Sequence, residues 1–351
     1  MKDVLPDINR WLGRGDNSIA LATVVAVAKS APRPPGAKMA VNACGEISGG
    51  VSGGCVEGAV VEIAEGVMGG DPPQLVHFGI ADSEAWDVGL PCGGEIDVWI
   101  QRFEPGRFSS IAGKGGRAVE VTLLEGAAPG AKLVVSADGE RSGTLGAPEL
   151  DDEAASTASE AMWAEMSERR GSLFFDVTAP APRLIMFGAV DIAASVCTLA
   201  RAAGWRPYVV DPRARFATAE RFPDAEGVIA GWPDEAFARL GGIDPATSIV
   251  VLTHDPKLDD AALEIALRSP ARFVGAMGSR RAQATRRERL LALGFDDSEL
   301  ERLSAPVGLD LGAMNREETA LSVLAEVVAA RHGREGGRLA LRQGRIHEVP
   351  A

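Results

Sequence analysis

The sequence contains 351 residues, of which 46% are hydrophobic and 24% are charged, as is usual for a soluble globular protein with two domains. Its net charge of −13 repels nucleic acid phosphates and anionic lipids, so we expect neither a nucleic acid nor a membrane as partner. None of the four cysteines forms a C-x-x-C pair, and the sequence shows no signal peptide and no apolar run long enough to cross a bilayer. These observations exclude a disulfide scaffold and predict a cytoplasmic protein with reduced thiols.

Residues 1–178 are predicted to form a mixed α/β domain. The apolar pattern of residues 55–68 places Val56, Val60 and Val67 on one face of a helix. A second amphipathic helix is expected over residues 151–169. Strands are expected where short apolar segments are bounded by turns, at residues 19–28, 38–43, 46–47, 94–103, 119–124, 132–136 and 172–177.

Two cysteines of this half, Cys55 and Cys92, lie next to glycines, which let a ligand approach backbone N–H groups and the sulfur together. Glu57 falls in the first turn of the predicted helix, where the macrodipole stabilises a carboxylate. An isolated free cysteine is more often a small buried residue, and Cys44 and Cys197 fit that description because they lack this glycine framing. The ligand-binding residues expected in this half are Ser52, Gly53, Gly54, Cys55, Glu57, Cys92, Gly93 and Gly94.

The proline-rich residues 179–182 mark the predicted domain boundary. Over residues 183–332, short apolar strands alternate with helical segments, which predicts a Rossmann-like, doubly wound parallel sheet. The last helix is expected to begin after the N-cap Asn315, and residues 333–351 are expected to form a loosely ordered tail. The strands are expected at residues 184–187, 207–210, 227–230, 248–252, 272–274 and 305–307.

Doubly wound sheets bind their ligands at the carboxyl ends of the strands. Asp211 follows Gly188 by 23 residues, as in a nucleotide-binding βαβ unit whose acid contacts a ribose. The arginines beside it can pair with a phosphate, but a solvated loop of mixed charge is an equally good interpretation. His254 is a lone loop histidine that can equally be a surface side chain, and no histidine has metal-binding spacing. The ligand-binding residues expected in this half are Gly188, Ala189, Asp211, Arg213, Arg215, His254, Met277, Gly278 and Ser279.

Several glycine-rich motifs occur in a fixed order along almost the whole chain, and together they resemble the XdhC/CoxI family. The motifs are Ser30-Ala31-Pro32-Arg33, Gly36-Ala37-Lys38-Met39, residues 49–57, residues 89–94, the strand beginning at Leu184, Asp211-Pro212-Arg213, residues 275–280 and residues 308–313. The resemblance implies a non-catalytic chaperone that binds the molybdenum cofactor, as molybdopterin or its dinucleotide form. It also implies two partners, a cysteine desulfurase that supplies the terminal sulfido ligand and a molybdenum hydroxylase, such as xanthine dehydrogenase or a CO-dehydrogenase-like enzyme, that receives the cofactor.

One motif departs from the family pattern. The family's usual Gly-Ala-Gly, followed by His or Pro, is replaced here by Gly188-Ala189-Val190-Asp191. Val190 removes the glycine that lets a pyrophosphate approach the backbone, and Asp191 adds a negative charge at that place. We therefore expect NAD(P) to bind weakly, and the sequence leaves open whether this turn binds a nucleotide at all.

Two other functions stay open. The βαβ order and Asp211 also fit an NAD(P)-dependent oxidoreductase, although no Tyr–Lys or Cys–His pattern has a recognisable catalytic spacing. The third function is that of a regulatory or scaffold protein whose degenerate Rossmann half mediates dimerisation. A homodimer is expected because the apolar helix face after Asn315 needs a partner, although the same face can pack on the sheet.

Overall fold

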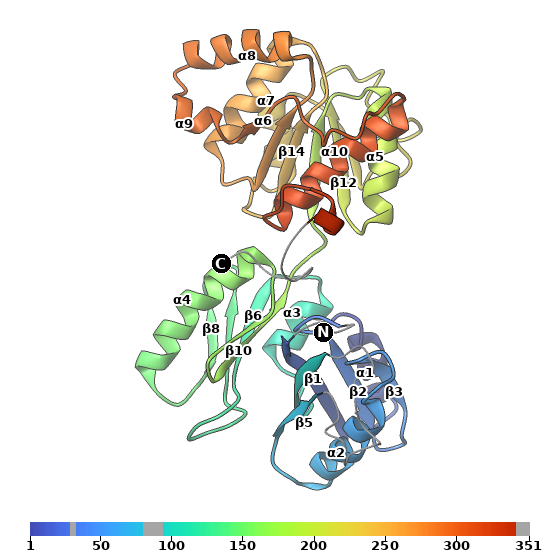
Figure 1. The fold of residues 1–351 in the computed structure, drawn as a ribbon, viewed down its shortest axis with the longest axis vertical. Helices are drawn as coiled ribbons and strands as arrows, with labels where there is room; N and C mark the ends of the chain where they lie inside the picture. Colours follow the sequence, from blue (N-terminus) through green and yellow to red (C-terminus); the bar gives the residue numbers. More distant parts are fainter. Residues whose placement is uncertain (29–32, 80–93, 342–351) are drawn as a thin grey trace. The chain divides into compact units, whose positions relative to one another are not determined.

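The structure, a computed structural model, describes residues 1–28, 33–79 and 94–341. The chain divides into two compact units, Met1–Pro180 and Ala181–Ala351 (Figure 1). Unit 1 contains two five-stranded sheets, and unit 2 contains one six-stranded sheet. None of the described helices is long and apolar enough to cross a membrane.

The first sheet of unit 1 is antiparallel and has the strand order β3-β2-β1-β5-β4. Side chains alternate between its faces, so Ala20 and Val24 pack with helix α2 (Glu57–Gly69) while Leu21 packs with helix α1 (Leu5–Gly13). Helix α2 thus begins directly after the glycine-rich residues 49–56. The strands are β1 (Ile19–Ala28), β2 (Lys38–Asn42), β3 (Ile47–Gly49), β4 (Gln74–Phe78) and β5 (Glu95–Arg102).

The second sheet of unit 1 is also antiparallel, with the order β8-β7-β6-β10-β9. Helix α4 (Pro148–Ala164) buries a row of alanines against one face, and helix α3 (Arg107–Gly113) buries Phe108 beside β6 and β7. A buried ion pair between Lys38 of β2 and Asp176 of β10 joins the two sheets. The strands are β6 (Ala118–Leu123), β7 (Lys132–Ser136), β8 (Arg141–Thr144), β9 (Glu168–Arg170) and β10 (Leu173–Thr178).

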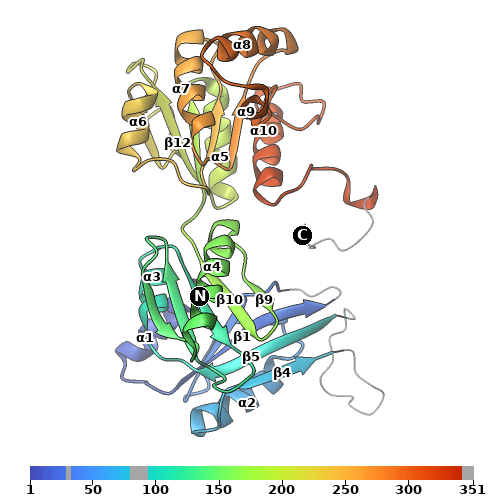
Figure 2. The same cartoon turned by 90° about the vertical axis from the view of Figure 1, so that its left-hand side faces the viewer.

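Unit 2 is the doubly wound parallel sheet that the sequence predicts, with helices on both of its faces (Figures 1 and 2). Its strand order is β13-β12-β11-β14-β15-β16. Leu184 and Met186 of β11 face helices α5 and α10, whereas Ile185 and Phe187 face helices α6 and α7. Its strands are β11 (Arg183–Phe187), β12 (Arg206–Asp211), β13 (Gly227–Ala230), β14 (Ser248–Val251), β15 (Phe273–Ala276) and β16 (Leu303–Ser304). Its helices are α5 (Asp191–Ala202), α6 (Pro233–Arg239), α7 (Pro256–Arg268), α8 (Arg280–Ala292), α9 (Asp297–Leu300), α10 (Arg316–Arg331) and the short 3₁₀ helix η1 (Leu339–Leu341).

Some element boundaries differ from the sequence-based expectation. The helix expected over residues 151–169 ends at Ala164, because Glu165 adopts a left-handed φ of 57° and residues 168–170 form β9. The last strand covers residues 303–304 instead of 305–307. Helices α1 and α3 and strands β4 and β8 were not predicted from the sequence. In α1 the helical spacing of the buried residues Leu5, Ile8 and Trp11 is a signal that could have indicated it.

The N-cap of the last helix is confirmed, because the Asn315 side chain accepts a hydrogen bond from the Glu318 N–H at 2.8 Å. Its apolar face is buried within unit 2 against α5 and the sheet, through Ala320, Val323, Leu324 and Val327. This is the alternative that the sequence left open for that face. The expected homodimer therefore stays a prediction without support from this helix.

Candidate functional site

The glycine-rich segment before α2 closes around the carboxylate of Glu57. Five backbone N–H groups of this segment donate to that carboxylate. Oε1 accepts from Val51 (3.1 Å), Ser52 (2.8 Å) and Gly53 (3.0 Å), and Oε2 accepts from Gly54 (2.8 Å) and Val56 (3.2 Å). Converging amides of this kind form an anion-binding nest, and here the anion is a side chain of the protein.

Ser52 completes the network. Its hydroxyl donates to Glu57 Oε2 at 2.5 Å and accepts from the N–H groups of Cys55 and Val56, both at 3.0 Å. Every backbone N–H from residue 51 to residue 56 therefore has an acceptor within the segment and its neighbour Glu57. Gly53 and Gly54 make this possible by adopting φ angles of 84° and 114°, which side-chain-bearing residues rarely adopt.

The Glu57 carboxylate is ionised at neutral pH. Partial burial opposes its ionisation, but hydrogen bonds from the Ser52 hydroxyl and from backbone N–H groups outweigh that effect and lower its pKa to about 2. Gly50 leaves room for the charge, since a Cβ at that position would lie 3.3 Å from Glu57 Oε1. The sequence predicted that the helix macrodipole stabilises a carboxylate at position 57. The hydrogen bonds that surround this carboxylate were not predicted, because they depend on the conformation of the loop.

The free thiols of unit 1 and unit 2 differ in exposure. Cys55 is partly exposed at the end of the nest, two residues before α2 begins. The expectation that Cys44 is a small buried residue is wrong, because Cys44 is exposed in the turn between β2 and β3. Cys197 is buried in the core of unit 2, as expected from the sequence, and burial raises the pKa of its thiol to about 12. Cys92 and Gly93 lie outside the described residues, and Gly94 directly precedes β5.

The predicted residues of unit 2 gather at one edge of its sheet. Gly188 and Met277 directly follow β11 and β15, Asp211 ends β12, and Thr253 lies two residues after β14, so all four lie at the carboxyl edge. Gly188 has a φ of 118°, and a Cβ there would lie 2.4 Å from Thr253 Cγ2. The turn after β11 is thus packed directly against Thr253 in the loop after β14, and only glycine fits at position 188.

Asp211 is fully buried and its carboxylate is occupied by the protein itself. Oδ2 accepts from the Ala189 N–H at 2.8 Å and from Arg213 Nη2 at 2.7 Å, while Oδ1 accepts from the Arg213 N–H and Nε, both at 2.9 Å. Burial opposes its ionisation, but the hydrogen bonds from Arg213 and Ala189 outweigh it and keep the pKa of Asp211 below its usual value. The side chains expected for a ribose and for a phosphate are therefore paired with each other.

The altered glycine turn is also neutralised internally. Arg221 donates to the Ala189 carbonyl at 2.9 Å and to Asp191 Oδ1 at 3.0 Å, so a cation of the protein lies at the start of α5. Val190 is the N-cap residue of this helix. A pyrophosphate bound here would meet the Val190 side chain and an acid that is already ion-paired.

The remaining predicted residues lie near the same edge. Arg215 and His254 are exposed, and the Ser279 hydroxyl caps α8 by accepting from the Ala282 N–H at 3.2 Å. Gly278, with a φ of 138°, sets the turn before this cap. These positions stay candidates for ligand contacts.

A buried ion pair behind this edge was not predicted from the sequence. Arg286 has 3% of its side chain exposed and pairs with Asp259 at 2.8 Å, and Asp259 also accepts from the Thr253 hydroxyl. Desolvation of the Asp259 carboxyl raises its pKa despite these partners. The pair joins α7 to α8, and no local sequence pattern indicates it.

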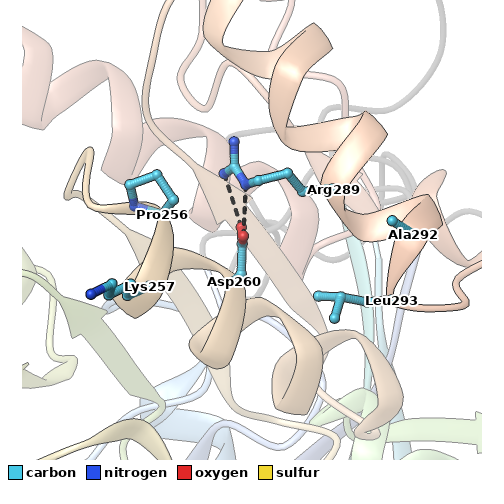
Figure 3. Close-up of a pocket in the computed structure, with 6 residues that line it drawn as sticks. All are labelled: Pro256, Lys257, Asp260, Arg289, Ala292 and Leu293. Atoms are coloured by element: carbon cyan, nitrogen blue, oxygen red, sulfur yellow. Dashed lines mark hydrogen bonds and ion pairs between the residues drawn. The ribbon is translucent and has the colours of Figure 1, made fainter.

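An open hollow of about 390 Å³ lies between α7 and α8 (Figure 3). Across it, Arg289 pairs with Asp260, with Nε–Oδ2 at 2.6 Å and Nη2–Oδ1 at 2.9 Å. It contains none of the predicted site residues, and its lining residues are Pro256, Lys257, Asp260, Arg289, Ala292 and Leu293. Among the residues that the structure describes, no group of three or more His, Cys, Asp or Glu side chains is placed to hold a metal ion.

Comparison with known proteins identifies the class. Residues 12–79 match the XdhC and CoxI family, and residues 184–327 match the XdhC Rossmann domain. These matches cover both halves of the chain in the order that the motifs predict. The chain therefore belongs to the XdhC/CoxI family.

Two curated relatives are similar to this chain over most of their length. The chain is 28% identical over 321 residues to a Bacillus subtilis protein named as a probable xanthine dehydrogenase subunit, covering 89% of this chain and 92% of the relative. It is 28% identical over 312 residues to the molybdenum cofactor insertion chaperone PaoD of Escherichia coli, covering 89% of this chain and 83% of the relative. A crystal structure of a xanthine dehydrogenase from Bacillus halodurans matches 97% of this chain and 98% of its own with a TM-score of 0.66 at 24% identity, which supports the fold.

Proposed function

We propose that this protein is a chaperone that binds the molybdenum cofactor, supports its sulfuration with a cysteine desulfurase and delivers it to a molybdenum hydroxylase. Support comes from the name of the Escherichia coli relative, a molybdenum cofactor insertion chaperone, and from that of the Bacillus subtilis relative, which points to xanthine dehydrogenase as the type of recipient. A CO-dehydrogenase-like enzyme is the other type of recipient that the resemblance implies. We place the protein in the cytoplasm.

The observation that carries the proposal is the partly exposed thiol of Cys55, which ends a fully hydrogen-bonded segment within the region that matches the XdhC and CoxI family. Thiolates are soft ligands that suit molybdenum and can accept or pass on sulfur. When bound, the cofactor would supply the metal and its dithiolene. Cys55 would contact the metal side of the cofactor, and Cys92 is the second thiol of this proposal.

The phosphate end of the cofactor fits the nest less well. All N–H groups of residues 51–56 already donate to Glu57 or Ser52, so this segment has none left for a phosphate. We therefore propose that residues 51–56 position the Cys55 thiol and do not bind the phosphate. Ser52, Gly53 and Gly54 then act on the cofactor by shaping the loop.

The test is to purify the full chain and measure bound molybdenum and pterin, alongside NAD(P) binding by calorimetry. Cys55→Ala and Cys92→Ala should lower molybdenum retention while the protein stays folded, and Cys44→Ala, which removes another exposed thiol of unit 1, should not. Alanine is the better replacement because a serine hydroxyl can keep a contact. Unchanged metal and pterin in both Cys55→Ala and Cys92→Ala would refute this assignment.

The same experiment separates the competing functions. An NAD(P)-dependent oxidoreductase should bind the nucleotide tightly, and a scaffold protein should bind neither ligand. Asp211 argues against the oxidoreductase because its carboxylate is held by Ala189 and Arg213, so a ribose would have to displace both.

A further inference from the structure

Glu57 has no free acceptor directed at a ligand, because both of its oxygens are surrounded by donors of the segment before it. The role of Glu57 therefore depends on the protein groups that its carboxylate binds. The ionised side chain fixes the N–H groups of residues 51–54 directly. It reaches Cys55 through one intermediate, the Ser52 hydroxyl, which donates to Glu57 and accepts from the Cys55 N–H.

The chain of contacts has a direction. A hydroxyl that donates its proton to a carboxylate keeps its lone pairs for two incoming N–H groups, and these are the N–H groups of Cys55 and Val56. Without the carboxylate, the Ser52 proton has no acceptor in this arrangement. The backbone before α2 would then lose the contacts that determine where the Cys55 side chain lies.

We infer that Glu57 is the positioning residue for Cys55, acting through Ser52 to present the thiol in one fixed place. This inference rests on the proposed function for the meaning of that thiol, and it assigns Glu57 a role different from direct contact with the cofactor. The two glycines with left-handed φ angles and the space at Gly50 serve the same arrangement, since each allows the carboxylate and the amides to meet. The glycine spacing of residues 50–57 is thereby explained by the ionised carboxylate of Glu57 rather than by a bound ligand.

Glu57→Gln is the sharpest substitution, because it keeps the shape and the Oε1 acceptor but turns Oε2 into an NH₂ group that faces three donors. Those donors are the Ser52 hydroxyl and the N–H groups of Gly54 and Val56. Ser52→Ala breaks the same path one step later. Glu65→Gln removes an equal charge from an exposed position on α2 and is the matched control.

The first readout needs no cofactor. The rate of Cys55 alkylation at constant pH, measured by peptide mass spectrometry, should change by roughly tenfold or more in Glu57→Gln and in Ser52→Ala, as expected for lost hydrogen bonds to a charged group. Cys44 of the same molecule should keep its rate, and Glu65→Gln should leave both rates unchanged. An unaltered Cys55 rate in Glu57→Gln overturns the inference.

The second readout is molybdenum retention in a double-mutant design. Glu57→Gln should lower retention in the wild-type background but add nothing to Cys55→Ala, because it acts through that thiol. A loss that adds to that of Cys55→Ala indicates a general structural effect and overturns the positioning role. If the wild-type protein holds neither molybdenum nor pterin while Glu57→Gln still alters Cys55 alkylation, the proposed function fails and the positioning role stands.

Discussion

The ion pair between Lys38 and Asp176 should be a main determinant of the stability of unit 1. It lies between the two sheets, with Nζ and Oδ2 2.6 Å apart and only 2% and 7% of the two side chains exposed. The Lys38 ammonium also donates to the Thr23 hydroxyl at 3.1 Å. Lys38→Met keeps most of the volume but leaves the Asp176 carboxylate buried without its cation.

The magnitude follows from this burial. Removing one partner of a buried ion pair typically costs about 3–5 kcal/mol, whereas replacing both partners by apolar residues is often neutral or stabilising. We therefore expect Lys38→Met to lower the free energy of unfolding of unit 1 by about 3–5 kcal/mol, and Lys38→Met with Asp176→Leu to recover most of that loss. Lys132→Met is the control, since Lys132 and Glu120 pair at 3.1 Å with 31% and 16% exposure, and its removal should cost about 1 kcal/mol or less.

Urea unfolding, monitored by hydrogen exchange of peptides from residues 1–180, measures the free energy of unfolding of unit 1 separately from that of unit 2. The double variant also covers the case in which Lys38→Met alone does not fold, because restored folding then reports the coupling. A Lys38→Met cost no larger than that of Lys132→Met would refute the argument. So would a double variant whose loss equals the sum of the two single losses.

Three further outcomes are expected. The pKa of Glu57 is about 2 in the folded protein against an ordinary 4.5, so its contribution to the free energy of unfolding is complete above pH 4.5 and is lost as the pH falls towards 2. After allowance for the partial exposure of this side chain, we expect a contribution of about 1–2 kcal/mol. Unit 1 of the wild type should therefore lose more stability on acidification than unit 1 of Glu57→Gln, as measured by urea unfolding at several pH values. Gly188→Ala should destabilise unit 2 by about 2–4 kcal/mol in thermal unfolding, because its Cβ would lie 2.4 Å from Thr253 Cγ2 at a φ of 118°; an unchanged midpoint would contradict this. NAD and NADP should bind with dissociation constants on the order of 1 mM or weaker in calorimetry, since Asp211 is held by Arg213, and micromolar binding would disprove it.

The sequence predicted the framework well where the pattern is local. The strand at residues 19–28 was predicted with its observed bounds, and the strands of unit 2 follow from short apolar runs between helical segments. Asn315 was placed correctly because N-capping depends on a residue type and the next few positions. Elements such as β4 and β8 were missed because they are stabilised by their neighbours in the sheet more than by their own residues.

The contacts of the candidate site could not be predicted in the same way. Arg286 is one of several arginines on α8, and its burial depends on Asp259, which lies 27 residues earlier on α7. The pairing of Asp211 with Arg213 is local, but whether the arginine turns towards the acid or towards a ligand depends on the turn after β11. Pattern reasoning gives the positions, whereas the partner of each polar group comes from the packing.

The two glycine-rich turns share one physical solution. In the first turn, the carboxylate of Glu57 accepts hydrogen bonds from the N–H groups of the segment before α2. In the second turn, the carboxylate of Asp211 accepts a hydrogen bond from the N–H group of Ala189. Glycine motifs of this kind indicate that an anion lies close to the backbone, but they do not say whether the anion belongs to a ligand or to the protein. A phosphate could bind either turn only by displacing an ionised side chain from its hydrogen bonds. The partly exposed thiol of Cys55 needs no such displacement, so a soft metal centre suits the first turn better than a nucleotide does.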